Sequence, residues 1–163
     1  IIEGAKVEVW HANSLGNYSF FDKSQSEFNL RRSILTDTDG HYVAQTTMPV
    51  GYGCPPDGTT QAVLNKLGRH GNRPSHVHYF VSAPGYRKLT TQFNIEGDKY
   101  LWDDFAFATR DGLVATAVDV TDEAEIARRG LNHPFKHITF NIELVKDQQG
   151  APSTEVDRRR ASA

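Results

Sequence analysis

The stretch Arg73-Pro74-Ser75-His76-Val77-His78-Tyr79-Phe80-Val81 decides the fold, because its second half is typical of a β-strand and carries two histidines. Side chains alternate between the faces of a strand, so His76 and His78 point the same way, roughly 6.6 Å apart. This spacing lets two imidazoles bind one metal ion without a bend in the backbone. The same pair occurs in copper sites and in structural settings, so alone it does not identify a metal.

The segments around this strand predict a mainly β fold. Strands are expected at residues 5–9, 32–36, 42–46, 76–82, 89–95, 113–120 and 137–144. The Asp39-Gly40 pair predicts a hairpin between the second and third of these. Helical signals are confined to 61–67 and 122–129, each of which is followed by a glycine. We therefore expect a β-sandwich of mixed sheets, with two short helices and long functional loops.

Composition limits the class of protein further. The 163 residues, 38% of them hydrophobic, suffice for about one domain with a hydrophobic core. A formal net charge of −2 predicts no nucleic-acid partner, and no apolar run is long enough to predict a membrane span. The single cysteine, Cys54, agrees with a reducing compartment, so we expect a cytoplasmic protein. We find no signal-peptide pattern at the start of the sequence. The chain opens on Ile1 rather than Met, so we expect a fragment.

Two irregular segments carry residues that could complete a metal site. Tyr18 lies in segment 16–22 and Tyr52 in segment 50–58, and loops on a rigid sheet are where functional residues concentrate. Zinc partners are scarce, because there is one cysteine and neither a Cys-x-x-Cys nor a His-Glu-x-x-His motif. A phenolate is a hard, strongly donating anion that suits ferric iron better than zinc or cuprous ion. Ferric iron is therefore a candidate, although a single tyrosine is more typical of packing than of metal binding.

Four stretches of the chain carry a wider similarity: Trp10-His11-Ala12-Asn13 continuing through Gly16-Asn17-Tyr18-Ser19-Phe20-Phe21-Asp22, then Pro49-Val50-Gly51-Tyr52-Gly53-Cys54-Pro55-Pro56-Asp57-Gly58, then Arg69-His70-Gly71-Asn72-Arg73-Pro74-Ser75-His76-Val77-His78, and Gly97-Asp98-Lys99-Tyr100-Leu101-Trp102-Asp103-Asp104-Phe105-Ala106. With two loop tyrosines and a paired histidine in this order, the chain resembles the intradiol ring-cleaving dioxygenases, most closely the bacterial catechol 1,2-dioxygenases.

The resemblance implies a non-haem Fe(III) held by four side chains, Tyr18, Tyr52, His76 and His78. It implies catalytic roles for Arg73, Tyr52 and Gln92, and a substrate pocket lined by Arg73, Phe105 and Ala106. The implied reaction is intradiol cleavage of catechol by O2 to cis,cis-muconate, within the β-ketoadipate pathway of aromatic catabolism. The resemblance further implies that the full-length protein is a homodimer joined through an N-terminal segment, which we expect to be absent from this chain.

The same resemblance implies that residues 1–147 are a catalytic domain, incomplete at its N-terminus, and that 148–163 form a polar tail. Other interpretations stay open. Hydroxyquinol or a chlorinated catechol could be the substrate of the same chemistry. A non-catalytic β-sandwich binding module, or a sandwich that binds copper or zinc, would belong to a different class. Metal analysis and a substrate panel distinguish these hypotheses.

Overall fold

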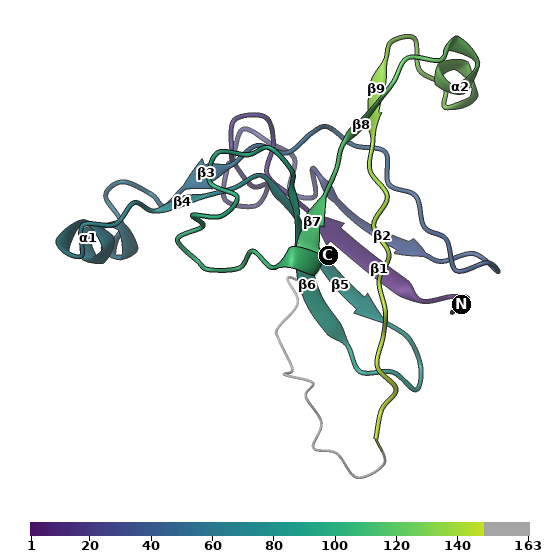
Figure 1. Ribbon diagram of the computed structural model, residues 1–163, viewed down its shortest axis with the longest axis horizontal. Coiled ribbons are helices and arrows are strands. Elements are labelled where there is room, and N and C mark those ends of the chain that lie inside the picture. Colours follow the sequence, from purple (N-terminus) through teal and green to yellow (C-terminus); the bar gives the residue numbers. More distant parts are fainter. Residues whose placement is uncertain (149–163) are drawn as a thin grey trace.

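The computed structural model describes residues 1–148, with a five-stranded sheet at its centre (Figure 1). The strand order is β2-β1-β5-β6-β7, formed by β2 (Arg31–Leu35), β1 (Lys6–Trp10), β5 (His76–Ser82), β6 (Leu89–Ile95) and β7 (Val114–Ala115). The first four strands pair antiparallel, whereas β7 joins β6 in parallel, so the sheet is mixed. The strand predicted around the paired histidines is therefore confirmed, and it lies in the middle of the sheet.

Two short ribbons extend from this sheet, each with a helix between its strands (Figure 1). The first ribbon pairs β3 (Tyr52–Gly53) with β4 (Asn72–Arg73), and α1 (Thr59–Lys66) lies between them. The second pairs β8 (Val118–Val120) with β9 (Phe135–His137), and holds α2 (Glu123–Arg128). A 3₁₀ turn, η1 (Asp111–Leu113), precedes β7. Helix α2 begins where the Asp122 carboxylate accepts the backbone N–H of Glu125 at 2.8 Å, a typical N-cap.

One face of the central sheet makes the hydrophobic core. Its buried residues come from four strands: Val7, Val9, Val77, Tyr79, Val81, Phe93, Ile95 and Ala115. Full burial of such a Val, Ile or Phe side chain contributes about 1.5–3 kcal/mol. Because side chains alternate along a strand, the residues between these point to the opposite face. On β5 and β6 those residues include His76, His78 and Gln92. The candidate site and the hydrophobic core therefore lie on opposite faces of the same two strands.

The layer that covers this core is extended chain rather than hydrogen-bonded strands. Tyr42, Ile138, Phe140, Ile142 and Leu144 all pack against the core cluster. The Tyr42 hydroxyl donates to the carbonyl of Phe140 at 2.8 Å, which joins the two covering segments. The predicted fold class, mainly strands in mixed sheets with two helices, is confirmed.

Three of the predicted strands differ from the structure. The turn of the hairpin forms, with the Gly40 N–H donating to the Asp37 carbonyl at 3.0 Å, but residues 42–46 make no strand. Strand β2 pairs with β1 instead, and the chain after the turn brings Tyr42 onto the core. The strand expected at 113–120 is divided between β7 and β8, which belong to different sheets. The strand expected at 137–144 ends at His137, and its apolar side chains pack on the core without a ladder.

No helix within residues 1–148 is long and apolar enough to cross a membrane. The polar tail predicted at 148–163 lies outside the described residues, apart from Gln148. The domain boundary at residue 147 therefore stays a prediction.

Candidate metal centre

The two histidines of β5 occupy the polar face of the central sheet. Their Nε2 atoms lie 3.0 Å apart, and the His76 side chain is almost fully buried. His78 lies opposite Gln92 of β6 and His76 lies opposite Asn94, so a polar row crosses the sheet at this point. Both rings therefore lie on the same face of the sheet, as predicted. Their Nε2 atoms are closer together than the roughly 6.6 Å that separates the two residues along the strand.

Neighbouring groups fix how each imidazole is presented. The Nδ1 atom of His76 lies 2.6 Å from the carbonyl of Pro74. Because a carbonyl only accepts, Nδ1 carries the proton and the lone pair of Nε2 faces the site. The ring of His78 stacks on the indole of Trp10, with centroids 4.9 Å apart and an interplanar angle of 12°.

Both histidines are neutral at pH 7. Burial lowers the pKa of His76 to about 4, with a further contribution from the charge of Arg73. Burial lowers the pKa of His78 to about 3, and its neighbour His76 adds to the effect. Neutral imidazole is the form that binds metal ions, so the environment favours ligation.

Two tyrosines complete the cluster. The hydroxyl oxygen of Tyr18 lies 3.4 Å from the Tyr52 hydroxyl and 3.4 Å from His76 Nε2. The Tyr52 hydroxyl is also 3.4 Å from His76 Nε2. Burial raises the pKa of Tyr18 above its ordinary value, and the nearby Tyr52 raises it further. A cation among these oxygens would favour the phenolate form.

Glycines allow the tyrosine loops to approach one another closely. A Cβ atom on Gly16, which has φ +81°, would lie 3.0 Å from Cβ of Tyr52. A Cβ atom on Gly51 would lie 2.6 Å from the carbonyl oxygen of Arg73, a contact that would force the backbone apart. Beside Tyr18, the buried Ser19 hydroxyl accepts from Nε of Arg31 at 2.9 Å, which attaches the loop to β2.

The four side chains fit a metal ion. Neighbouring donor atoms lie 3.0–3.4 Å apart. Two ligands that each bind one ion at about 2.0–2.1 Å are separated by about 2.9–3.4 Å at bond angles of roughly 90–109°. Two phenol oxygens and two imidazole nitrogens suit ferric iron. Elsewhere in residues 1–148, no three His, Cys, Asp or Glu side chains gather to hold a metal.

Arg73 lies against this cluster, on β4. Its Nη1 is 3.0 Å from His76 Nε2 and 3.5 Å from the Tyr52 hydroxyl. Its Nη2 donates to Oε1 of Gln92 at 2.9 Å, so the predicted arginine and glutamine are both brought to the site. Burial disfavours the charge of Arg73, but hydrogen bonds to Asp104 and the proximity of Tyr52 outweigh it and raise the pKa. A permanent cation therefore adjoins the donor cluster.

Asp104 is a site residue that the sequence did not reveal. It is buried and forms a salt bridge with Nε of Arg73 at 3.1 Å. Burial disfavours its ionised form, but hydrogen bonds from Arg73 and from the Ala106 N–H outweigh this and lower its pKa. In the sequence, the neighbouring Asp103 carries the same side chain, and no local pattern separates a buried aspartate from an exposed one.

The predicted substrate-pocket residues follow Asp104 directly. Phe105 is half-buried and Ala106 is exposed, and the Phe105 N–H donates to the carbonyl of Asn72 at 3.2 Å. This bond places their segment beside β4, next to Arg73. Their role in a substrate pocket stays a prediction.

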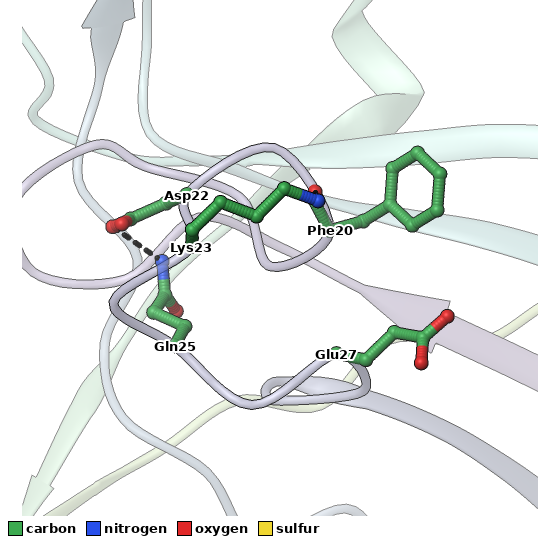
Figure 2. Close-up of a pocket in the computed structure, with 5 residues that line it drawn as sticks. All are labelled: Phe20, Asp22, Lys23, Gln25 and Glu27. Carbon is green, nitrogen blue, oxygen red and sulfur yellow. Dashed lines mark hydrogen bonds between the residues drawn. The ribbon is translucent and has the colours of Figure 1, made fainter.

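A surface pocket lies on the loop that follows Tyr18, away from the donor cluster. It is lined by Phe20, Asp22, Lys23, Gln25 and Glu27 (Figure 2). The Gln25 amide donates to Asp22 at 3.0 Å, while Phe20 and Glu27 point away from this pair (Figure 2). None of the four donor side chains lines the pocket, so the chemistry is assigned to the donor cluster rather than to this hollow.

Known proteins resemble the chain along most of its length. A family model described as dioxygenase matches residues 1–146. The catechol 1,2-dioxygenase of Acinetobacter guillouiae is 81% identical over 152 residues, which cover 93% of this chain and 50% of that protein. The crystal structure of Acinetobacter radioresistens catechol 1,2-dioxygenase is 88% identical with a TM-score of 0.94, covering 100% of this chain and 53% of that one. The chlorocatechol 1,2-dioxygenase of Cupriavidus pinatubonensis is 36% identical, over 93% of this chain and 55% of that protein. The chain thus spans about half the length of the curated relatives it matches.

Proposed function

The chain belongs to the dioxygenase family whose model it matches over residues 1–146, and on this premise we propose that the full-length protein is a catechol 1,2-dioxygenase. The reaction would be intradiol cleavage of catechol by O2 to cis,cis-muconate, a step in aromatic catabolism. The observation that carries the proposal is the convergence of two phenol oxygens and two imidazole nitrogens beside one buried guanidinium.

Tyr18, Tyr52, His76 and His78 would hold a non-haem Fe(III). Bound there, Fe(III) would act as a Lewis acid that binds the diol and withdraws electron density from its ring. The protein's own side chains supply the remaining functions, namely proton transfer and stabilisation of charge. Of the two tyrosines, Tyr52 is the one within 3.5 Å of Arg73. The family resemblance implies a catalytic role for this tyrosine, and on that basis we assign to Tyr52 the acceptance of a proton from one hydroxyl of the incoming diol.

Arg73 is placed to stabilise the negative charge that the diol acquires on deprotonation. Its guanidinium is buried and already oriented, so little reorganisation is needed when that charge appears. Gln92 accepts from Arg73 Nη2 and so helps to hold the guanidinium in place. Phe105 and Ala106, on the segment beside Arg73, would line the ring-binding pocket.

Catechol is proposed rather than a chlorinated catechol because of the identities, 81% against 36%. A panel of catechol, chlorocatechols and hydroxyquinol, compared by kcat/KM, tests this choice. A chlorocatechol or hydroxyquinol cleaved with higher kcat/KM than catechol would assign the protein to that branch of the same chemistry.

We further propose a cytoplasmic homodimer, joined through an N-terminal segment of the kind that the resemblance implies. A lone cysteine, Cys54, agrees with the reducing interior of the cell. Light scattering of the full-length protein after size-exclusion chromatography tests the dimer, and a monomer at micromolar concentration would contradict it.

A visible spectrum of the full-length protein is the direct test of function. With Fe(III) bound, the protein should be red, because ferric tyrosinate absorbs visible light. Catechol added under argon should shift the band, and admission of O2 should then release one cis,cis-muconate per catechol. Iron-containing protein without the band, or catechol consumption without muconate, would contradict the proposal.

A further inference from the structure

Asp104 joins Arg73 to the segment that follows it. Its Oδ1 accepts from Arg73 Nε at 3.1 Å and from the Ala106 N–H at 3.0 Å. Its Oδ2 accepts from Arg73 Nη2 at 3.2 Å and from the Ala108 N–H at 3.3 Å. Each carboxylate oxygen therefore receives one donor from the guanidinium and one from the backbone. The side chain is 1% exposed, so water does not share these bonds.

This arrangement requires a carboxylate. An asparagine at the same position has one acceptor oxygen and one donor NH2 group. Whichever way its amide turned, the NH2 would face one N–H of the arginine and one backbone N–H. One side of the bidentate contact with Arg73 and one bond to the segment would be lost together.

A second chain of hydrogen bonds ties the same guanidinium to the far end of the segment. The Gln92 amide, which accepts from Arg73, donates to Oδ1 of Asn94 at 2.7 Å. Asn94 is fully buried and donates in turn to the hydroxyl of Thr109 at 2.7 Å. Segment 104–109 is thus attached to Arg73 at both of its ends.

The backbone of this segment is held in an unfavourable conformation between those attachments. Phe107 has φ +52°, a region that residues with a side chain rarely adopt. The Arg69 guanidinium lies 4.4 Å from the Phe107 ring centroid and donates to the Phe105 carbonyl at 3.3 Å. Such backbone strain persists only where surrounding contacts impose it. Asp104 supplies two of those contacts through the N–H groups of Ala106 and Ala108.

We propose that Asp104 is a positioning residue that holds the Arg73 guanidinium against the donor cluster and, with the same carboxylate, sets segment 104–109 beside it. The proposal deepens the proposed function, on which it rests, by naming the group that keeps the arginine aimed at the diol. A carboxylate that served only to neutralise a buried cation would need no bonds to the backbone, whereas Asp104 makes two.

A double-mutant cycle in the full-length, iron-containing protein tests this role. The proteins are wild type, R73Q, D104N and R73Q/D104N, with D103N as the matched control. Asp103 is adjacent, carries the same side chain, is 77% exposed and contacts His70 rather than Arg73. For each protein, iron content, the tyrosinate band, the dissociation constant of catechol under argon, and kcat are measured.

D104N should lower kcat by about 100-fold while the iron content and tyrosinate band stay at the wild-type level. Added to R73Q, the same change should lower kcat by less than about tenfold, because the guanidinium that Asp104 holds is already absent and only its bonds to segment 104–109 remain to be weakened. D103N should stay within about twofold of wild type. Losses that multiply in the double variant, a D104N enzyme with near-wild-type kcat, or an equally impaired D103N would each overturn the proposal.

The same proteins also allow two further outcomes to be interpreted, a D104N protein that fails to fold and a wild-type protein without iron or turnover. If D104N fails to fold, R73Q/D104N should recover folded protein by removing both charges, and failure of the double variant would overturn the pairing. A wild type without iron or turnover would refute the proposed function instead. The urea midpoints of the iron-free proteins then test whether Asp104 acts through Arg73. D104N should lower the midpoint in wild type and not in R73Q. Additive lowering by the two substitutions would overturn the pairing.

Discussion

At the scale of single residues, Tyr18 is the donor whose loss is most informative. Its hydroxyl lies 3.4 Å from both Tyr52 and His76, so Y18F deletes one corner of the cluster and little volume. We expect iron affinity to fall by at least about 10–100-fold, the range seen even for residues that only support metal ligands. Iron content after dialysis against a chelator, with the visible spectrum, measures this.

The matched control is Y86F, which removes the same hydroxyl from a residue in the turn after β5. The backbone of Tyr86 forms an isolated bridge with Lys146, far along the sheet from the donors. This variant should keep the iron content and colour of wild type. A Y18F protein that binds iron as tightly as Y86F would remove Tyr18 from the ligand set.

At the scale of elements, side chains on strand β6 alternate between the hydrophobic core and the candidate site, so substitutions on the two faces should affect different properties. Phe93 faces the core and is 3% exposed, whereas Gln92 faces the site and binds Arg73. F93A should lower the free energy of unfolding by about 3–5 kcal/mol, because it removes a buried aromatic ring and leaves a cavity. Urea denaturation measures the change.

The exposed Thr90 on the same strand provides the comparison, and T90A should change stability by no more than about 0.5 kcal/mol. Folded F93A protein should still bind iron when assayed well below its unfolding midpoint. Equal destabilisation by the two substitutions would contradict the placement of the core on the Phe93 face.

At the scale of the whole molecule, the stability of the iron-free protein should depend on pH through buried histidines. His11 is buried, with its ring nitrogens 2.7 Å from the Ala12 carbonyl and 2.8 Å from the Thr46 hydroxyl, and burial lowers its pKa. The unfolded chain therefore binds more protons than the folded one below about pH 6.5, so stability falls as the pH drops through that window.

The variant H11Q should flatten this dependence by up to about 1.4 kcal/mol per pH unit. His76 and His78, whose pKa values are also lowered, contribute with the same sign and remain in both proteins. Free energies of unfolding at pH 5, 6 and 7 give the two slopes, and the difference isolates His11. Identical slopes would show that His11 is not buried as a neutral ring.

The sequence predicted the parts of this molecule that depend on local pattern. The strands at 76–82 and 89–95 agree with β5 and β6 residue for residue, because alternation and turn residues are local signals. Segments 42–46 and 138–144 have the same β-like composition but no ladder, and only the tertiary arrangement decides whether such a segment pairs. The convergence of Tyr18 and Tyr52 on His76 was expected from the family resemblance, whereas the role of Asp104 depends on a contact 31 residues away in sequence.

The donor cluster has a consequence for the chain as a polymer. Its members come from positions 18, 52, 76 and 78, so a single bound ion would bridge segments as much as 60 residues apart. Such an ion stabilises the native state because it binds the folded chain and not the unfolded one, and the stabilisation grows as the ion concentration rises above its dissociation constant. The metal ion would then stabilise the folded polypeptide as well as take part in catalysis. Resistance to proteolysis would rise with the fraction of protein that has the ion bound.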